Sequence, residues 1–391
     1  MPVLTPDTAR STSSTWPKVR AAALERATAL PFPTADEEIW RYSRIAELDV
    51  NLFTPVAVES TITGGDESVS VTRVPASAST VDPSLATLFD DARGDDLFSE
   101  LNLAHMDVIV VAVARNKVVA TPIVITHTAN VDGAVCFPRL VIDAAENSEV
   151  TVVERFVSVD GVRSLVVPVL DARTGHAARV RYLGINELGT DSWMIGQHLS
   201  VGQRDSDTLL ATVALGGDYA RVSTSARLDG QGGNTRQVAL YFAGGTQMHD
   251  FRTLQEHAAP RTTSDLLFKG AVQDTAKSVY TGLIKIHKNA KGSAAFQTNR
   301  NLTLSRGAWA ESVPNLDIET NDVKCSHAST VGPIDEDQLF YLESRGVDPD
   351  VAQRLVVLGF FDEVLAQLPV GDLAAPLRRQ VAAKLSIEGA S

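Results

Sequence analysis

The chain has 391 residues, of which 44% are hydrophobic and 21% charged, and its formal net charge is −13. This composition is typical of a soluble globular protein, and the length allows two or three domains or one elongated domain with appendages. The acidic balance argues against nucleic-acid binding, which uses clustered Lys and Arg, and the aliphatic runs are too short to span a membrane.

The two cysteines, Cys136 and Cys325, are too few for a disulfide framework and suit a reducing cytosol. No signal-peptide pattern opens the chain, so we expect a cytoplasmic protein. Cysteine packs as a small hydrophobe, and the apolar neighbours of Cys136 favour a buried structural role for it.

The N-terminal region is predicted to be helical. Residues 1–15 are rich in Pro, Ser and Thr and read as a disordered tail. A helix is predicted over Lys18–Leu30, and a second, amphipathic one over Glu37–Leu48. Trp40 and Tyr42 in the second helix are interpreted as packing aromatics. The following residues, 55–100, show no clear pattern.

From Met106 onward, short Val- and Ile-rich runs alternate with Asn, Asp and Gly turns for about two hundred residues. No helical pattern alternates with these runs, which disfavours a doubly wound α/β sheet. Such strands can build a sandwich, a barrel or a β-solenoid. The length of the region and the Asn residues at expected corners (Asn289, Asn301 and Asn321) favour the solenoid. The predicted strands are Val108–Val113, Val118–Thr126, Val150–Val159, Ser164–Leu170, Ala178–Ile185, Leu209–Leu215, Arg221–Leu228, Gln237–Phe242, Val279–His287 and Leu302–Leu304.

After Gly332 the pattern becomes helical, and four helices are predicted. Asp335 is a candidate N-cap for the first, with Gln338 placed as in a capping box. The apolar faces of these helices fit either a partner groove or packing on the β region. The predicted helices are Asp335–Ser344, Val351–Leu358 closed by Gly359, Phe360–Leu368 and Leu373–Ile387. The predicted regions are a tail (1–15), a helical and partly unassigned region (16–100), a β core (101–332) and a helical domain (333–391).

Common catalytic signatures are missing from the chain: it has no phosphate-binding P-loop, no G-x-S-x-G elbow and no H-E-x-x-H helix. One pair of soft ligands stands out, Cys325 and His327. Residues at i and i+2 of a strand share a face, so thiol and imidazole should point the same way.

Such a pair suits iron, zinc or an iron–sulfur species, but a complete site needs three or four ligands. Other residues, such as His249, His257 and His287, or a partner protein must complete it. The alternative interpretation is that Cys325 is simply buried and His327 hydrogen-bonds at a strand end.

The segments N-D-V-K-C-S-H (Asn321–His327) and E-D-Q-L-F-Y-L-E-S-R-G (Glu336–Gly346) closely resemble the SufD family of iron–sulfur cluster assembly proteins. Further support comes from the segments His257–Gly270, Asp274–Gly282 and Gln297–Leu302, and E-E-I-W-R-Y (Glu37–Tyr42) is a weaker N-terminal match. The paralogous SufB family has a cysteine followed by aspartate where this chain has Asn299–Asn301, and a His-Glu pair in place of His327 and Ala328. Both differences favour SufD.

The resemblance implies a right-handed parallel β-helix (solenoid) core flanked by N-terminal and C-terminal α-helical regions. It also implies a non-enzymatic scaffold subunit in a cytosolic complex with SufB and two copies of the ATPase SufC. In that family the Cys-Ser-His segment lies at the SufB interface, which makes His327 the expected metal contact and Cys325 a neighbouring ligand or structural thiol. The ATPase-docking residues implied by the resemblance are Phe340, Tyr341, Arg345, Gly346 and Phe360.

No permanent cofactor is expected, only transient iron or an Fe–S cluster at the SufB interface. The sequence leaves open both flavin binding and self-dimerisation of the isolated chain. Two alternative functions remain: a SufB-like paralogue that is itself the primary cluster scaffold, and a β-solenoid enzyme acting on carbohydrate. The second lacks the export signal and the carboxylate array that such enzymes use.

Overall fold

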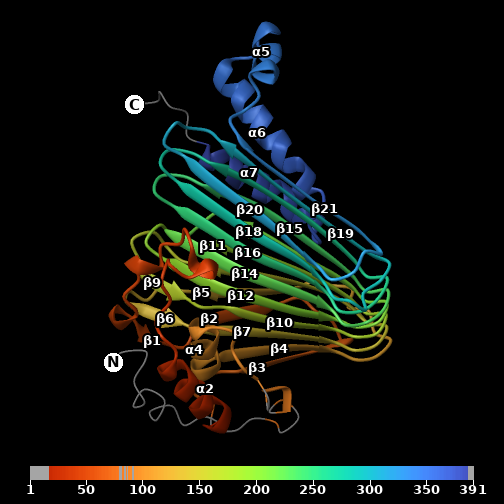
Figure 1. Cartoon of the computed structure of the whole chain (residues 1–391). Coiled ribbons are helices and arrows are strands. Elements are labelled where there is room, and N and C mark those ends of the chain that lie inside the picture. Colours follow the sequence, from red (N-terminus) through yellow and green to blue (C-terminus); the bar gives the residue numbers. More distant parts are fainter. Residues whose placement is uncertain (1–16, 79–81, 83–84, 86, 90–91, 386–391) are drawn as a thin grey trace.

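The computed structural model describes residues 17–78, 82, 85, 87–89 and 92–385, so the predicted tail over residues 1–15 lies outside the described residues. Two long sheets form a β-solenoid of about eight coils, with helices at both ends (Figure 1). The mainly β prediction is confirmed.

The two sheets are the walls of the solenoid, and each coil contributes one strand to each wall. The first sheet has the strands β3 (Val69–Val74), β4 (Asp107–Val113), β7 (Pro138–Ala144), β10 (Val169–Thr174), β12 (Trp193–Gly202), β14 (Tyr219–Leu228), β16 (Met248–His257), β18 (Lys277–Ile286) and β20 (Trp309–Ile318), with β1 (Thr54–Pro55), β6 (Ala134–Cys136) and β9 (Ser164–Val166) beside it. The second has β2 (Glu59–Thr63), β5 (Ile123–Thr128), β8 (Glu149–Val157), β11 (Arg179–Glu187), β13 (Asp207–Ala214), β15 (Asn234–Ala243), β17 (Thr263–Val272), β19 (Ser293–Thr303) and β21 (Val323–Gly332).

All the pairings in these sheets are parallel except two at the N-terminal end, where β3 joins β4 and β2 joins β5 in antiparallel fashion. Part of the unassigned region 55–100 therefore extends both walls.

One corner of the coil repeats a left-handed residue. Its N–H donates to a carbonyl of the next coil, as in Asn116 to Glu146 and Asp205 to Gln231. The residues with positive φ at this corner are Asn116, Asn147, Ala177, Asp205, Gly232, Arg261 and Gly292. Because Ala and Arg take this place as well as Asn and Gly, the corner repeats in structure but not in sequence.

Each predicted strand overlaps an observed one, but Ser164–Leu170 is divided between β9 and β10. Nine strands were not predicted: β1, β2 and β3 in and beside the unassigned region, and β6, β7, β12, β16, β17 and β20 in the predicted β core. The corner prediction is wrong for Asn301, which lies within β19 and is buried. The Asn301 amide is held there because it accepts a hydrogen bond from Tyr241 Oη at 2.7 Å.

The predicted first helix is α2 (Pro17–Ala29), which packs with α4 (Leu97–His105) on the outer face of the first coils. The predicted helix Glu37–Leu48 is wrong: the segment forms the 3-10 turns η1 (Glu38–Trp40), η2 (Ile45–Glu47) and η3 (Val50–Leu52). Tyr42 between them has a φ of 66°, which ends a right-handed helix.

Contacts with the outer face of the first sheet hold this segment in its irregular path. Arg221 and Arg252 donate hydrogen bonds to the carbonyls of Ile39 and Arg41. Trp40 is buried and its ring lies under the Arg221 guanidinium, 4.0 Å from the ring centroid. Trp40 is thus a packing residue, as predicted.

At the other end of the chain the helices are α5 (Glu336–Ser344), α6 (Pro349–Leu365) and α7 (Ala374–Lys384), with the 3-10 turn η5 (Gly371–Leu373) before α7. Asp335 caps α5 by accepting from the N–H of Asp337, without the predicted capping box to Gln338. The predicted break at Gly359 is also wrong, because α6 runs through it. Gly359 faces solvent, and a continuous apolar stripe on the other side of the helix outweighs the roughly 1 kcal/mol cost of a helical glycine.

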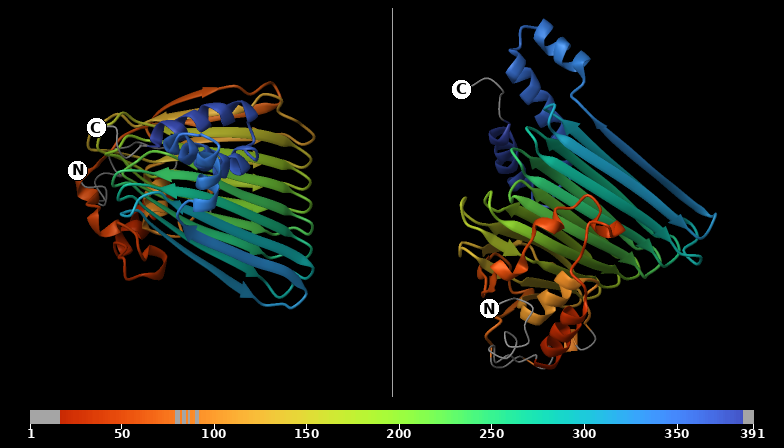
Figure 2. Two further views of the ribbon diagram at one scale, coloured as in Figure 1. Left: turned by 90° about the horizontal axis from the view of Figure 1, so that it is seen from above. Right: turned by 60° about the vertical axis from the view of Figure 1, so that its left-hand side comes forward.

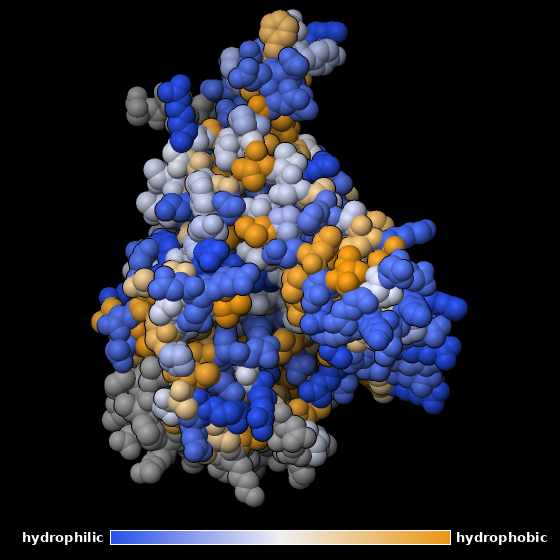
Figure 3. All heavy atoms as spheres, in the orientation of Figure 1, coloured by the Kyte–Doolittle hydropathy of each residue, from blue (hydrophilic) through white to orange (hydrophobic). Residues whose placement is uncertain are grey.

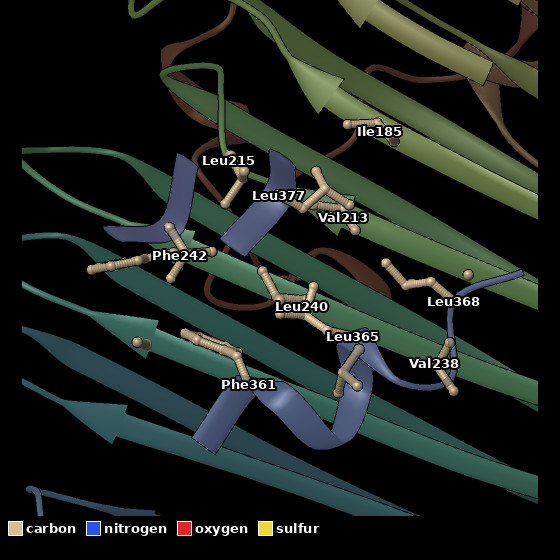
Figure 4. Close-up of a cluster of buried hydrophobic side chains, with 14 of the residues drawn as sticks. Ile185, Val213, Leu215, Val238, Leu240, Phe242, Phe361, Leu365, Leu368 and Leu377 are labelled. Carbon is tan, nitrogen blue, oxygen red and sulfur yellow. The ribbon is translucent and has the colours of Figure 1, made fainter. Parts of the chain in front are cut away.

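The stripe packs on the outer face of the second sheet (Figure 4). There Phe361 and Leu365 from α6, and Leu377 from α7, meet side chains such as Leu240 and Phe242. Packing on the β region therefore explains the apolar faces of α6 and α7, which cover the sheet, whereas α5 projects beyond the last coil (Figure 2). The partner groove stays a prediction. Among the described helices, none is both long and apolar enough to cross a membrane.

Candidate functional site

Cys325 and His327 lie on β21, the last strand of the second sheet. Val323 and Cys325 are partly buried and pack against an interior cluster that includes Ile286, whereas Lys324 is exposed. Odd-numbered residues of this strand therefore face the solenoid interior. His327 shares this face with Cys325 but is exposed, because β21 belongs to the final coil.

The chemistry of the two cysteines differs from that of an activated thiolate. Burial raises the pKa of the Cys325 thiol, which favours its protonated form. Burial, together with the charge of Asp107, raises the pKa of Cys136 to about 12. Cys136 is a free, buried cysteine, in keeping with a structural role.

Within the described residues, no group of three or more His, Cys, Asp or Glu side chains could hold a metal ion. The upstream histidines have partners of their own. His249 bonds the carbonyl of Gly216, His257 bonds Thr262 and Ser264, and His287 pairs with Glu256. Among the described residues, none of these histidines joins Cys325 and His327, which stay a pair of candidate ligands.

The site lies at an open edge. The described strands pair with β20 and β21 on one side only, so both end the sheets with free backbone groups. Large apolar side chains are exposed along this edge, namely Leu316, Ile318 and Val331, each about 40% exposed. Each of these edge strands has ten residues and one unpaired side, which is the kind of edge to which a strand of another chain can add.

The other predicted surface centres on α5. Phe340 is 71% exposed and Tyr341 58% exposed, although both are large aromatics. The guanidinium of Arg345 lies 5.1 Å from the Tyr341 ring centroid, and Gly346 ends the helix with a φ of 84°. These residues lie on α5 and at its C-terminal end, and Figure 3 shows hydrophobic surface amid hydrophilic residues at the tip of this projection.

Phe360, the fifth predicted docking residue, is on α6 and half-buried. The ammonium of Lys269 lies 4.6 Å from its ring centroid and donates a hydrogen bond to its carbonyl. A groove connects the two helices. Its outer part, of about 390 Å³, is lined by Asp337, Gln338, Tyr341, Leu342 and Val356, and its inner part, of about 440 Å³, reaches Phe360.

Sequence reasoning missed one residue beside His327. Gln297 on β19 is the direct neighbour of His327 in the ladder and is buried. Its segment, Q-T-N-R-N-L, was recognised only as a family motif. The signal that could have found it is the pairing of β19 with β21, which no local pattern shows.

Comparison with known proteins assigns a family. Residues 125–360 match the family model described as SUF system FeS cluster assembly, SufBD core domain. An iron–sulfur cluster assembly SufBD family protein of Mycobacterium leprae is 36% identical over 286 residues, which cover 71% of this chain and 72% of the relative. The SufD proteins of Escherichia coli and Bacillus subtilis are 29% and 30% identical, covering 86% and 66% of this chain and 85% and 60% of their own lengths.

Proposed function

The chain belongs to the SufBD family of the SUF iron–sulfur cluster assembly system, and we propose that it is a non-catalytic scaffold subunit of the SufD type. In this proposal it pairs with a SufB-type paralogue in the cytoplasm and docks a SufC-type ATPase. Iron and the nascent cluster are its cargo, with no permanent cofactor. The observation that carries the proposal is that two soft ligands lie beside an unpaired sheet edge.

An incomplete pair of ligands at the edge of a sheet is expected if a partner chain supplies the remaining ligands. Thiolate and imidazole are good ligands for iron, but structural and cluster sites use three or four. Addition of a partner strand along β20 or β21 would bring foreign side chains over His327 and bury the exposed apolar residues of the edge.

The proposal also assigns a binding surface for the ATPase. The chain lacks a phosphate-binding P-loop, so nucleotide hydrolysis falls to a partner. Exposed aromatics beside an arginine are the residue types that anchor protein interfaces. Phe340, Tyr341 and Arg345 supply these beside an open groove, and we propose this surface for the ATPase.

The alternative, a SufB-like primary scaffold, is disfavoured by the relatives named SufD and by Asn299–Asn301. Asn299 and Asn301 are both buried and hydrogen-bonded to Tyr241 in the solenoid interior. They act there as packing residues, and neither is a soft metal ligand.

A His327→Ala variant is expected to assemble with SufB and SufC but to lose most of the iron and sulfide recovered with the complex. The imidazole is exposed and makes no hydrogen bond within the described part of the chain, so its loss should not affect folding. Anaerobic co-expression followed by iron and sulfide analysis measures this. Ser326→Ala, on the opposite face of the same strand, is the control. Wild-type iron and sulfide in the His327 variant would refute the metal role.

The double variant Phe340→Ala/Tyr341→Ala is expected to weaken ATPase binding by at least tenfold, because interface aromatics often contribute about 2 kcal/mol or more each. Both rings are exposed, so the free energy of unfolding should change little. Pull-down or calorimetry with the SufC-type ATPase gives the affinity. Glu343→Ala, on the same helix, is the control. Unchanged binding, or binding by a chain truncated after Gly332, would place the ATPase elsewhere.

A further inference from the structure

The interior-facing column that ends at His327 contains an unusual buried amide. Through the parallel ladder, His327 is in register with Gln297 on β19, and Gln297 with Leu266 on β17. Register partners on neighbouring parallel strands are about 4.8 Å apart and point to the same face. Gln297 and His327 are therefore side-chain neighbours on the inside of the last two coils.

Gln297 is only 1% exposed; its Nε2 lies beside the Tyr280 hydroxyl, to which it can donate, whereas its Oε1 has no hydrogen-bond partner within the described residues. An unpaired buried polar group costs about 1–3 kcal/mol, and native proteins rarely leave one without a purpose. The next position inward is Leu266, so an apolar side chain of similar size fits this column. Burying the Gln297 amide therefore costs more folding free energy than burying a leucine at the same position would.

The opposite wall makes room for this amide. A Cβ added to Gly282 on β18 would lie 2.4 Å from Gln297 Nε2 and 2.3 Å from Tyr280 Oη. Only the missing side chain of glycine allows the amide to reach across the interior there. The Tyr280 hydroxyl is paired with Thr253 Oγ1 at 2.9 Å and is also the neighbour of Gln297 Nε2, so Gln297 Oε1 is the amide atom left for a further donor.

The neighbouring imidazole lacks a partner as well. His327 makes no hydrogen bond or ion pair within the described residues. A histidine that ligates a metal almost always donates its other ring N–H to an acceptor, which fixes the tautomer and the ring orientation. A glutamine Oε1 is such an acceptor, and it lies on the adjacent strand on the same face.

We propose that Gln297 is the positioning residue of His327: its Oε1 accepts the imidazole N–H and leaves the other ring nitrogen free for iron. This inference rests on the proposed metal role of His327. Changes in side-chain torsions are sufficient to join the two, because their Cα atoms are ladder neighbours. The buried amide then gains the partner that its burial requires.

The test compares Gln297→Leu with Gln237→Leu in the full-length chain. Gln237 on β15 carries a second buried amide whose Oε1 has no partner within the described residues, in the same column and two strands further in. With ¹⁵N-labelled histidine and the His327→Ala variant for assignment, the metal-free wild type is expected to show a single ring tautomer at His327. Gln297→Leu should show both tautomers, and Gln237→Leu only one.

Metal affinity gives a second readout. Co²⁺ binding is measured in the complex with SufB. The difference between the wild type and His327→Ala gives the binding that depends on His327. Gln297→Leu is expected to weaken it by about 10- to 100-fold, as loss of an outer-shell partner usually does. Gln297→Glu keeps an acceptor oxygen and should restore it. Gln297→Leu should still fold, because the neighbouring position in the column is already a buried leucine, Leu266.

Identical tautomer populations and equal Co²⁺ affinity in the wild type and in Gln297→Leu would overturn the proposal and leave the amide a packing residue. Failure of the proposed function has a different signature. In that case His327→Ala itself would leave Co²⁺ binding and cluster formation unchanged, whatever tautomer the metal-free ring adopts.

Discussion

An Asp250→Asn variant is expected to lose about 3–5 kcal/mol of its free energy of unfolding, because two buried guanidinium groups would lose their shared counter-charge. Asp250 on β16 has no exposed surface. One carboxylate oxygen accepts from Arg221 and from the Tyr219 hydroxyl, and the other from Arg252. Burial alone would lower the pKa of Arg221, but the Asp250 charge raises it, so Arg221 stays charged.

The effect should extend to the N-terminal segment. Arg221 and Arg252 also bind the carbonyls of Ile39 and Arg41, so Asp250 holds both arginines in place for that contact. We expect faster hydrogen exchange across η1 in the variant, together with the lower denaturation midpoint.

Asp229→Asn is the matched control for this experiment. Asp229 pairs with Arg227 on the surface, where both side chains are more than a third exposed, and such pairs contribute about 0–1 kcal/mol. Equal losses in the two variants would mean that the buried cluster is no more stabilising than a surface pair.

The second large effect is expected on acidification. Burial lowers the pKa of His198 to about 4, that of His249 to about 3 and that of His257 to about 4, from an ordinary value of 6.5. For His198 the charge of Glu154 opposes this shift, and for His249 the nearby Lys384 adds to it. In the folded chain these rings stay neutral at pH values where the unfolded chain binds a proton to each.

Because the unfolded chain binds these protons and the folded chain does not, folding stability falls as the pH falls. The stability due to the neutral rings is fully present above pH 6.5 and decreases as the pH falls from there toward about 4. Each histidine contributes a slope of up to about 1.4 kcal/mol per pH unit, so the three together approach about 4 kcal/mol per unit. Urea denaturation between about pH 7.5 and pH 5, above the range in which most carboxylates titrate, measures this slope.

Replacing one buried ring, as in His198→Gln, should reduce the slope by close to one proton. His176→Gln, at a side chain that is 45% exposed, should leave it unchanged. A stability that stays constant down to pH 5 would contradict the prediction.

Prediction from sequence worked where local pattern and burial agree. The Val- and Ile-rich runs became strands because their alternate residues fill the solenoid, and α5 begins at its predicted cap. Prediction from sequence failed at β16. The interior residues of this strand include His249, Gln255 and His257, and its outer residues include Asp250 and Arg252. With polar side chains buried on both faces, no hydrophobic period marks this strand.

The two helical errors have the same kind of cause. The segment 37–48 has an amphipathic spacing, but its backbone carbonyls are bound by arginines from strands more than 180 residues away. Gly359 reads as a helix end, yet tertiary packing of Phe361 and Leu365 on the second sheet keeps α6 continuous. Both outcomes depend on partners that are distant in the chain.

The sequence by itself determined what depends on spacing along the backbone. These features are the series of short strands separated by turns, the strand that places Cys325 and His327 on one face, and the helix that follows Asp335. Strand geometry sets the i to i+2 relation locally, without help from the fold. Only the tertiary structure decided which face that is, and that His327 is open while Cys325 packs inside. It also brought Gln297 beside His327, since the register between β19 and β21 is set by stacked corners and ladder hydrogen bonds between residues 30 positions apart.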